Sequence, residues 1–218
     1  MNVSFLLVCE GSSDSALVHH IRKLLTKKCG ATEADGNSFY HGTCLIKKME
    51  QELELSSVPD LIFVHRDADY YRNTDAAGAE KRYQEIKNAV MSVKHKYKYK
   101  YTDRYVGIVP VRMTEAWLLV NECEIRRVAG QPRSRHDLHL PAVQRIEKIP
   151  DPKELLKKAL SRAGLPKGVR RKKDFEQNFT QHRRQLIENL PVEGPLEHLR
   201  SWARFRDDTK EALRALRD

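Results

Sequence analysis

The sequence predicts an α/β protein with a mostly parallel sheet flanked by helices, and three observations lead to this prediction. An apolar, strand-like run occurs three times, at Val3 to Val8, Asp60 to Val64 and Tyr105 to Val111. Each run is followed by a polar loop and then by apolar residues at helical spacing. Repeated strand-to-helix units predict parallel strands, because each helix returns the chain to the edge where the next strand begins.

The first strand-to-helix unit is the clearest. Val3 to Val8 is continuously apolar or β-favouring, as is typical of a strand covered by helices on both faces. Turn-forming residues interrupt the run at Cys9 to Asp14, and helical spacing follows from Ala16 to Leu25. The pattern from Cys29 to Leu55 is mixed, and there we expect a short strand near Phe39 to Ile46 and then a short helix.

The second and third units end their strands in acidic loops. The second strand leads into His65-Arg66-Asp67-Ala68-Asp69 and a long helix from near Asp75, and the third leads into Thr114-Glu115-Ala116-Trp117-Leu118-Leu119. In parallel sheets the ligand crevice lies beyond the carboxyl ends of the strands. We therefore expect the acids of all three loops to face one crevice.

The composition changes beyond Ala129, where a polar, turn-rich stretch gives way to basic helices. We expect a core at residues 1–130, a linker at 131–150 and a basic helical C-terminal extension at 151–218. Its helices are predicted from about Pro152 to Ala163, from about Phe175 to Asn189, and from Pro195 to the C-terminus.

The overall charge indicates the class of partner. The chain has 40 Lys and Arg against 30 Asp and Glu, a formal net charge of +10. This surplus favours a polyanionic partner such as nucleic acid. No apolar run approaches the roughly 18 to 20 residues of a membrane-spanning helix, and the N-terminus lacks the basic region of a signal peptide, so we expect a cytoplasmic protein that does not enter membranes. The four cysteines lack zinc-site spacing and are expected to be free thiols.

The candidate chemistry lies in Glu10, Asp67 and Asp69. Carboxylates gathered at one edge repel one another, so they need a cation or bound protons. Oxygen ligands suit a hard divalent ion such as Mg²⁺, and the single residue between the two aspartates lets both reach one site. Two metal ions about 4 Å apart would serve phosphodiester cleavage.

Several neighbours of these acids have two interpretations each. Asp14 could ligate metal or cap a helix, and Glu115 could complete the acid cluster or begin an ordinary helix. Arg66 could hold a scissile phosphate or pair with Asp67 and Asp69, of which we favour the pairing. His65 is expected to be a hydrogen-bonded neighbour rather than a catalytic base.

Two segments combine cations in ways that suit nucleic acid. The loop from Lys167 to Lys173 has five cations, which favour a bound polyanion or an acidic partner; the candidates for nucleic-acid binding are Lys167, Arg170, Arg171, Lys172, Lys173 and, near the acids, Arg66. Lys94 to Tyr101 alternates cations with tyrosines and could stack on bases. A solvated edge strand explains this alternation better.

The motif Glu10-Gly11-x-x-Asp14 after the first strand, with Asp67-x-Asp69 after a later one, resembles the TOPRIM domain of topoisomerases, primases and overcoming-lysogenization-defect nucleases. The resemblance covers roughly residues 1–130. It implies a TOPRIM-like, Rossmann-like fold in which Glu10 is a metal ligand or general acid/base and Asp67 and Asp69 hold Mg²⁺ or Mn²⁺. Asp14 would be a second ligand, and the reaction would be phosphodiester hydrolysis.

A narrower resemblance concerns Thr114 to Leu119 and Ser201-Trp202-x-x-Phe205. These segments resemble a group of small standalone TOPRIM-like proteins, some of which occur beside ATPases in bacterial phage-defence operons. This implies a metal-dependent nuclease, acting on DNA rather than RNA, that works with an ATPase partner in antiviral defence. The alternative is a non-catalytic subunit that binds nucleic acid or a partner protein, and a homo-oligomer is open in either case.

Overall fold

The computed structural model describes residues 1–41, 44–55, 59–68, 75–97, 104–164 and 178–217. Its centre is a sheet of four parallel strands in the order β2-β1-β3-β4. The strands are β1 (Asn2–Val8), β2 (Glu33–Phe39), β3 (Leu61–His65) and β4 (Tyr105–Ile108). The α/β class and the parallel sheet predicted from the sequence are therefore confirmed.

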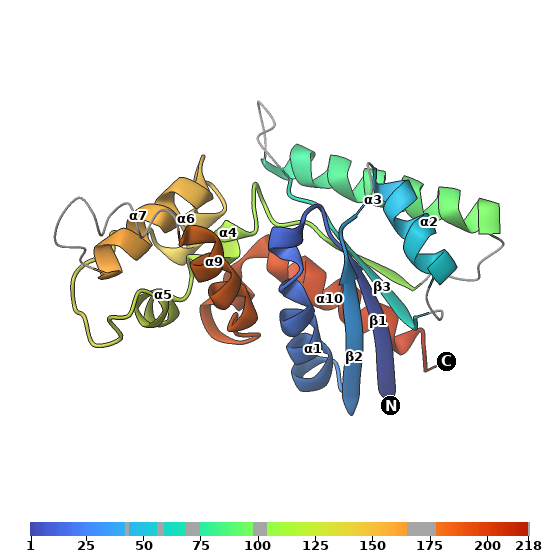
Figure 1. Ribbon diagram of the computed structural model, residues 1–218, viewed down its shortest axis with the longest axis horizontal. Helices are drawn as coiled ribbons and strands as arrows, with labels where there is room; N and C mark the ends of the chain where they lie inside the picture. The colour runs from blue at the N-terminus through green and yellow to red at the C-terminus, as the bar shows by residue number, and fades with distance from the viewer. Residues whose placement is uncertain (42–43, 56–58, 69–74, 98–103, 165–177, 218) are drawn as a thin grey trace.

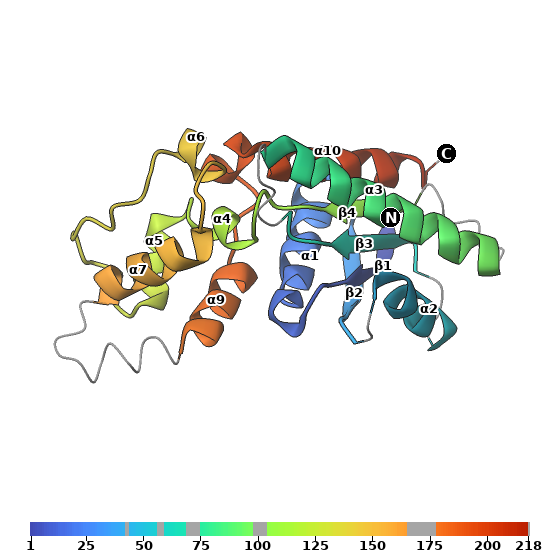
Figure 2. The same ribbon diagram turned by 90° about the horizontal axis from the view of Figure 1, so that it is seen from above.

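Helices cover both faces of this sheet, which gives three layers (Figures 1 and 2). In β1 the side chains of Phe5 and Leu7 join one apolar cluster, whereas Leu6 and Val8 join another. The first cluster includes residues of α1 (Leu17–Lys28) and α10 (Arg200–Arg214), and the second includes residues of α2 (Leu45–Leu55) and α3 (Asp75–Tyr97). Burial on both faces explains why the strands are apolar at nearly every position.

A group of helices continues the fold beyond the carboxyl ends of the strands, at the left of Figure 1. It contains α4 (Glu115–Leu118), α5 (Glu122–Val128), α6 (Val143–Ile146), α7 (Pro152–Gly164) and α9 (Phe179–Glu188). The chain also forms two short 3-10 helices, η1 (Ser12–Asp14) and η3 (Gly194–His198). The C-terminal residues return to the core, since α9 contacts α1 and α10 packs against β4. The division at residues 131–150 stays a prediction.

Two predicted elements differ from the structure in detail. The strand expected near Phe39 to Ile46 was wrong, because β2 ends at Phe39 and α2 begins at Leu45. β2 has the sequence EADGNSF, whose weak strand preference is overridden by full pairing with β1. The helix expected from Pro195 onward is interrupted at Leu199, where the backbone is extended. The helix from Pro152 is confirmed.

Two smaller expectations concern cysteines and membranes. All four cysteines are free, as predicted, and Cys9 is buried at the end of β1. Among the helices that the structure describes, none has the length and apolarity needed to cross a bilayer.

Candidate active site at the carboxyl edge of the sheet

The strand order places the reversal of sheet topology between β1 and β3. From β1 the chain moves to β2 on one side, then returns to β3 on the other side and continues to β4. In open parallel sheets, ligands bind at such a reversal beyond the carboxyl ends of the strands. Glu10 follows β1 and Asp67 follows β3, so these two residues flank the switch point.

The structure brings Glu10 and Asp67 side by side. Oε2 of Glu10 accepts a hydrogen bond from the backbone N–H of Asp67 at 3.3 Å. The Glu10 side chain is 41% exposed and that of Asp67 is 19% exposed. Oδ1 of Asp67 accepts from the backbone N–H of Thr114 at 3.0 Å, whereas Oδ2 has no hydrogen-bond or ion-pair partner in the described part of the chain. The two carboxylates thus keep oxygens that solvent or a ligand can reach.

Arg66 lies on the α3 side of these carboxylates. Its guanidinium is 3.9 Å from Oε1 of Glu10 and 3.8 Å from Oε2 of Glu85, distances typical of loose ion pairs. Among the described residues it pairs with Glu10 and Glu85. Of the two expected partners, Asp67 forms no ion pair with it, and Asp69 lies outside the described residues. The backbone explains this, because Arg66 and Asp67 are adjacent residues at a strand end and project to opposite faces.

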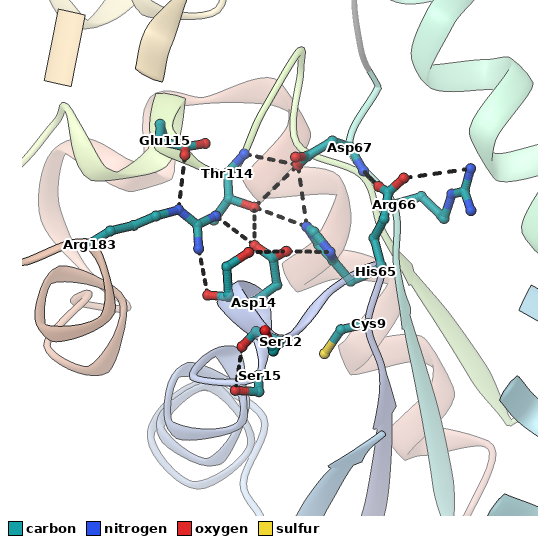
Figure 3. A network of polar contacts seen from close by, with 12 residues as sticks. Cys9, Ser12, Asp14, Ser15, His65, Arg66, Asp67, Thr114, Glu115 and Arg183 are labelled. Carbon is teal, nitrogen blue, oxygen red and sulfur yellow. Dashed lines mark hydrogen bonds and ion pairs between the residues drawn. The ribbon is translucent and has the colours of Figure 1, made fainter. Parts of the chain in front are cut away.

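Asp14 and Glu115 lie in a very different environment, in contact with Arg183 of α9. Arg183 donates from Nη2 to Oδ1 of Asp14 at 2.6 Å and from Nε to Oε1 of Glu115 at 2.9 Å, and it also donates to the carbonyl of Ser13 (Figure 3). All three charged side chains are almost completely buried. A protein cation therefore neutralises these two acids, which stand 169 and 68 residues from Arg183 in the chain.

Thr114 and His65 connect the two pairs of acids (Figure 3). The hydroxyl of Thr114 is 2.9 Å from Nε2 of His65, 3.2 Å from Oδ1 of Asp67 and 3.4 Å from Oδ1 of Asp14. His65 is completely buried, with Nε2 3.4 Å from Asp67 and Nδ1 4.0 Å from Asp14. The polar network is thus continuous from Arg183 to Asp67.

Charges within the network oppose the effect of burial on its titrating groups. Burial favours neutral His65, but the carboxylates of Asp67 and Asp14 outweigh it and raise the pKa of His65 above its ordinary value. Burial likewise favours protonated Asp14, but His65 and Arg183 outweigh it and hold the pKa of Asp14 below its ordinary value. Both groups are therefore stabilised in their charged forms.

Lys48 of α2 fixes the loop that carries Glu10. Its buried ammonium donates to the carbonyl oxygens of Cys9 at 3.1 Å and Glu10 at 2.7 Å. These carbonyls belong to the first two residues after β1. Lys48 therefore holds the backbone of Glu10 against α2.

Comparisons were made with protein-family models, with curated proteins and with solved structures. None of the three found a match to this chain. The interpretation of the site therefore depends on its geometry and on the motif resemblance.

The donor set at Glu10 and Asp67 fits a hard divalent cation. Carboxylate oxygens are the ligands that Mg²⁺ and Mn²⁺ prefer, and both residues have oxygens in reach of solvent. Asp69, the third expected ligand, lies outside the described residues, and within the described ones no group of three or more His, Cys, Asp or Glu side chains is arranged to hold a metal ion. Asp14, already bound by Arg183, is less suited to ligation than Glu10 or Asp67.

Most of the residues predicted to contact nucleic acid lie outside the described part of the chain. Lys167, Arg170, Arg171, Lys172 and Lys173 lie outside the described residues. The tyrosine-rich alternation is also outside them from position 98 onward. Of that predicted set only Arg66 is described, beside Glu10.

Sequence reasoning missed Arg183, Thr114 and Lys48. Arg183 is one of two consecutive arginines in a basic helix, and only the apolar spacing of Phe179, Leu186 and Ile187 indicates that it faces inward. Thr114 was noted only as part of a helix start. Lys48 is one of two consecutive lysines, so its burial has no local signal.

Proposed function

We propose that this chain is a metal-dependent phosphodiester hydrolase acting on nucleic acid, DNA rather than RNA. The observation that carries the proposal is the adjacency of Glu10 and Asp67 at the topological switch point, with accessible carboxylate oxygens. The motif resemblance to TOPRIM nucleases and the net charge of +10 support the same substrate class.

In this proposal Glu10, Asp67 and Asp69 hold Mg²⁺ or Mn²⁺. Such an ion supplies Lewis acidity and positive charge at the substrate phosphate. Arg66, whose guanidinium makes only loose ion pairs with described residues, binds a non-bridging phosphate oxygen. Thr114 fixes the orientation of Asp67, and Arg183 holds Asp14 and Glu115 so that the loop after β1 keeps its shape.

The direct test is cleavage of plasmid DNA by the purified protein with Mg²⁺, Mn²⁺ or a chelator. We expect cleavage only with metal, and a loss of more than about 100-fold in Asp67→Asn and Asp69→Asn. Asp35→Asn is the matched control, because Asp35 is an exposed acid on β2 paired with Arg22. Equal cleavage by wild type and Asp67→Asn would remove the assigned site, and faster cleavage of RNA would change the substrate.

The biological setting follows the narrower resemblance. The chain would be an effector of anti-phage defence that acts together with an ATPase. Cells expressing both proteins should reduce phage plaque formation, and the Asp67→Asn variant should restore plaques. Protection that persists in this variant would separate the defence role from hydrolysis.

A second candidate function is a non-catalytic subunit that binds nucleic acid or a partner. The observation that favours it is the neutralisation of Asp14 and Glu115 by Arg183, which gives two of the five predicted acids a structural task. Calorimetry distinguishes the candidates. No heat of Mn²⁺ binding at millimolar concentration, with intact DNA binding, would favour the subunit over the hydrolase.

A further inference from the structure

A cavity of about 660 Å³ lies beside the chain that follows β4, and neither Glu10 nor Asp67 lines it. Its walls come from α3, the chain after β4, α6 and the segment from η3 into α10. Its volume falls within the range of about 300 to 1,000 Å³ that small-molecule sites occupy. β4 is the edge strand of the described sheet, and the cavity lies against Val109 and Val111, which follow it.

The acids that line the cavity are already engaged. Glu147 accepts hydrogen bonds from the backbone N–H groups of Arg200 at 3.0 Å and Ser201 at 2.9 Å, and from the Ser201 hydroxyl at 2.6 Å. Glu80 pairs with Arg204 at 3.0 Å. The negative charge in the cavity is therefore largely compensated by neighbouring groups.

The cations at its rim are not engaged in the same way. The side chains of Lys148 and Arg200 are exposed and line the cavity, and in the described ranges neither has an ion-pair or hydrogen-bond partner. With Arg204 also present, the cavity presents more positive than negative charge. A ligand with a negatively charged group complements this rim.

The inner wall has a different character. Val143 and, to a small extent, Val111 expose apolar surface, and Tyr83 adds an aromatic ring covered by the Arg204 guanidinium at 3.5 Å from the ring centroid. Apolar and aromatic lining with a few charged groups is the usual composition of a small-molecule site. The wall suits a flat apolar moiety, whereas the rim suits an anion.

We propose that this cavity binds a phosphorylated compound with a flat ring system, the size of a nucleoside monophosphate. Its phosphate contacts Lys148 and Arg200, and its ring lies against Val143 and Val111. The site is separate from Glu10 and Asp67 and does not depend on hydrolysis. One lining residue, Val111, stands three residues before Thr114 in the chain, and Thr114 donates a hydrogen bond to Asp67.

The test is calorimetric titration of the full chain with AMP, adenosine and inorganic phosphate, without metal. We expect AMP to bind with a Kd below about 1 mM and adenosine to bind more weakly, while phosphate competes with AMP. Arg200→Ala and Lys148→Ala should weaken AMP binding at least about tenfold, and Lys153→Ala, an exposed lysine of α7, should leave it unchanged.

The controls keep this site distinct from the candidate active site. Asp67→Asn should bind AMP as wild type does, because Asp67 does not line the cavity. The proposal would be overturned if the chain bound no AMP at about 5 mM AMP. It would also be overturned if adenosine bound as tightly as AMP, or if AMP binding were lost only in Asp67→Asn. None of these results depends on whether the chain cleaves DNA.

Discussion

Two pairs of acids at one edge of the sheet have opposite environments. Glu10 and Asp67 are partly exposed, and the Arg66 guanidinium is loosely placed at 3.9 Å from Glu10. Asp14 and Glu115 are buried, and Arg183 contacts both directly. Residues of the same chemical type thus form an open pair and a closed pair, linked by Thr114 and His65.

The difference shows how burial changes the meaning of a carboxylate. A buried carboxylate needs a fixed partner, since its desolvation costs several kcal/mol. An exposed one keeps its hydration and can exchange water for a ligand. The closed pair therefore suits a structural task, and the open pair suits the binding of a cation. The following changes test this contrast.

The largest effect is expected from removing the cation of the closed pair. Arg183→Ala removes the cation that contacts both buried carboxylates and leaves Asp14 with only His65 at 4.0 Å. It should lower the free energy of unfolding by about 3–5 kcal/mol. Arg184→Ala is the matched control, because Arg184 is exposed and, among the described residues, pairs only with Glu188 on the same helix. Its cost should stay within about 0.5 kcal/mol. Urea unfolding of both variants checks this, and similar midpoints would contradict the buried pairing.

Among the described residues, His20 and His65 are completely buried, and they should affect the pH dependence of stability in opposite directions. His20 lies among Trp117, Trp202 and Phe205, where it accepts a hydrogen bond from Trp202 Nε1, and burial lowers its pKa from 6.5 to about 4. The unfolded chain therefore binds a proton at higher pH than the folded one. Stability from His20 is complete above pH 6.5 and falls as the pH drops toward 4, by about 2 kcal/mol at pH 5.

His65 should change the stability with pH in the opposite direction. Its pKa is raised, so its contribution to stability is complete below pH 6.5 and is lost as pH rises through the folded-state pKa.

The His20 prediction is tested by urea unfolding at pH 5 and pH 7. The difference in unfolding free energy between the two pH values should be smaller in His20→Gln than in wild type. An unchanged difference would mean that His20 does not titrate as its surroundings require.

A smaller loss is expected at the link between the two pairs. Thr114→Val keeps the shape of the side chain but removes the hydroxyl that contacts His65, Asp67 and Asp14. The buried partners lose a hydrogen bond, which should cost about 1–2 kcal/mol. Thr26→Val is the control, since Thr26 is exposed and its hydroxyl donates to backbone carbonyls of its own helix. Equal urea midpoints for the two variants would show that the network is not coupled through Thr114.

The smallest effect on stability is expected at the open pair. Glu10→Gln should change the free energy of unfolding by less than about 0.5 kcal/mol, because its carboxylate is exposed and loosely paired. Its affinity for Mn²⁺ should nevertheless fall by at least about 10-fold, measured by calorimetry. Glu33→Gln, at the amino end of β2, should change neither quantity. A large stability loss in Glu10→Gln with unchanged Mn²⁺ affinity would reverse the assignment of the two pairs.

Much of the fold could be predicted because its signals are local. The continuous apolar runs of β1 and β3 identify buried parallel strands, and the polar residues after them identify the loops at the carboxyl edge. β2 could not be located, since Asp35, Gly36 and Asn37 disfavour strands and only pairing with β1 stabilises them there. The break at Leu199 was equally hidden, because Glu147 binds the N-terminus of α10 from 53 residues away.

The sequence by itself determined which residues stand at the ends of the strands, and so which acids could meet at the crevice. Periodicity carries that information within short segments. Only the tertiary structure decided that Glu10 and Asp67 stay open while Asp14 and Glu115 are closed by Arg183. The reason is physical: the ionic state and availability of a carboxylate depend on burial and on the nearest charge, and Arg183 reaches Asp14 from 169 residues away.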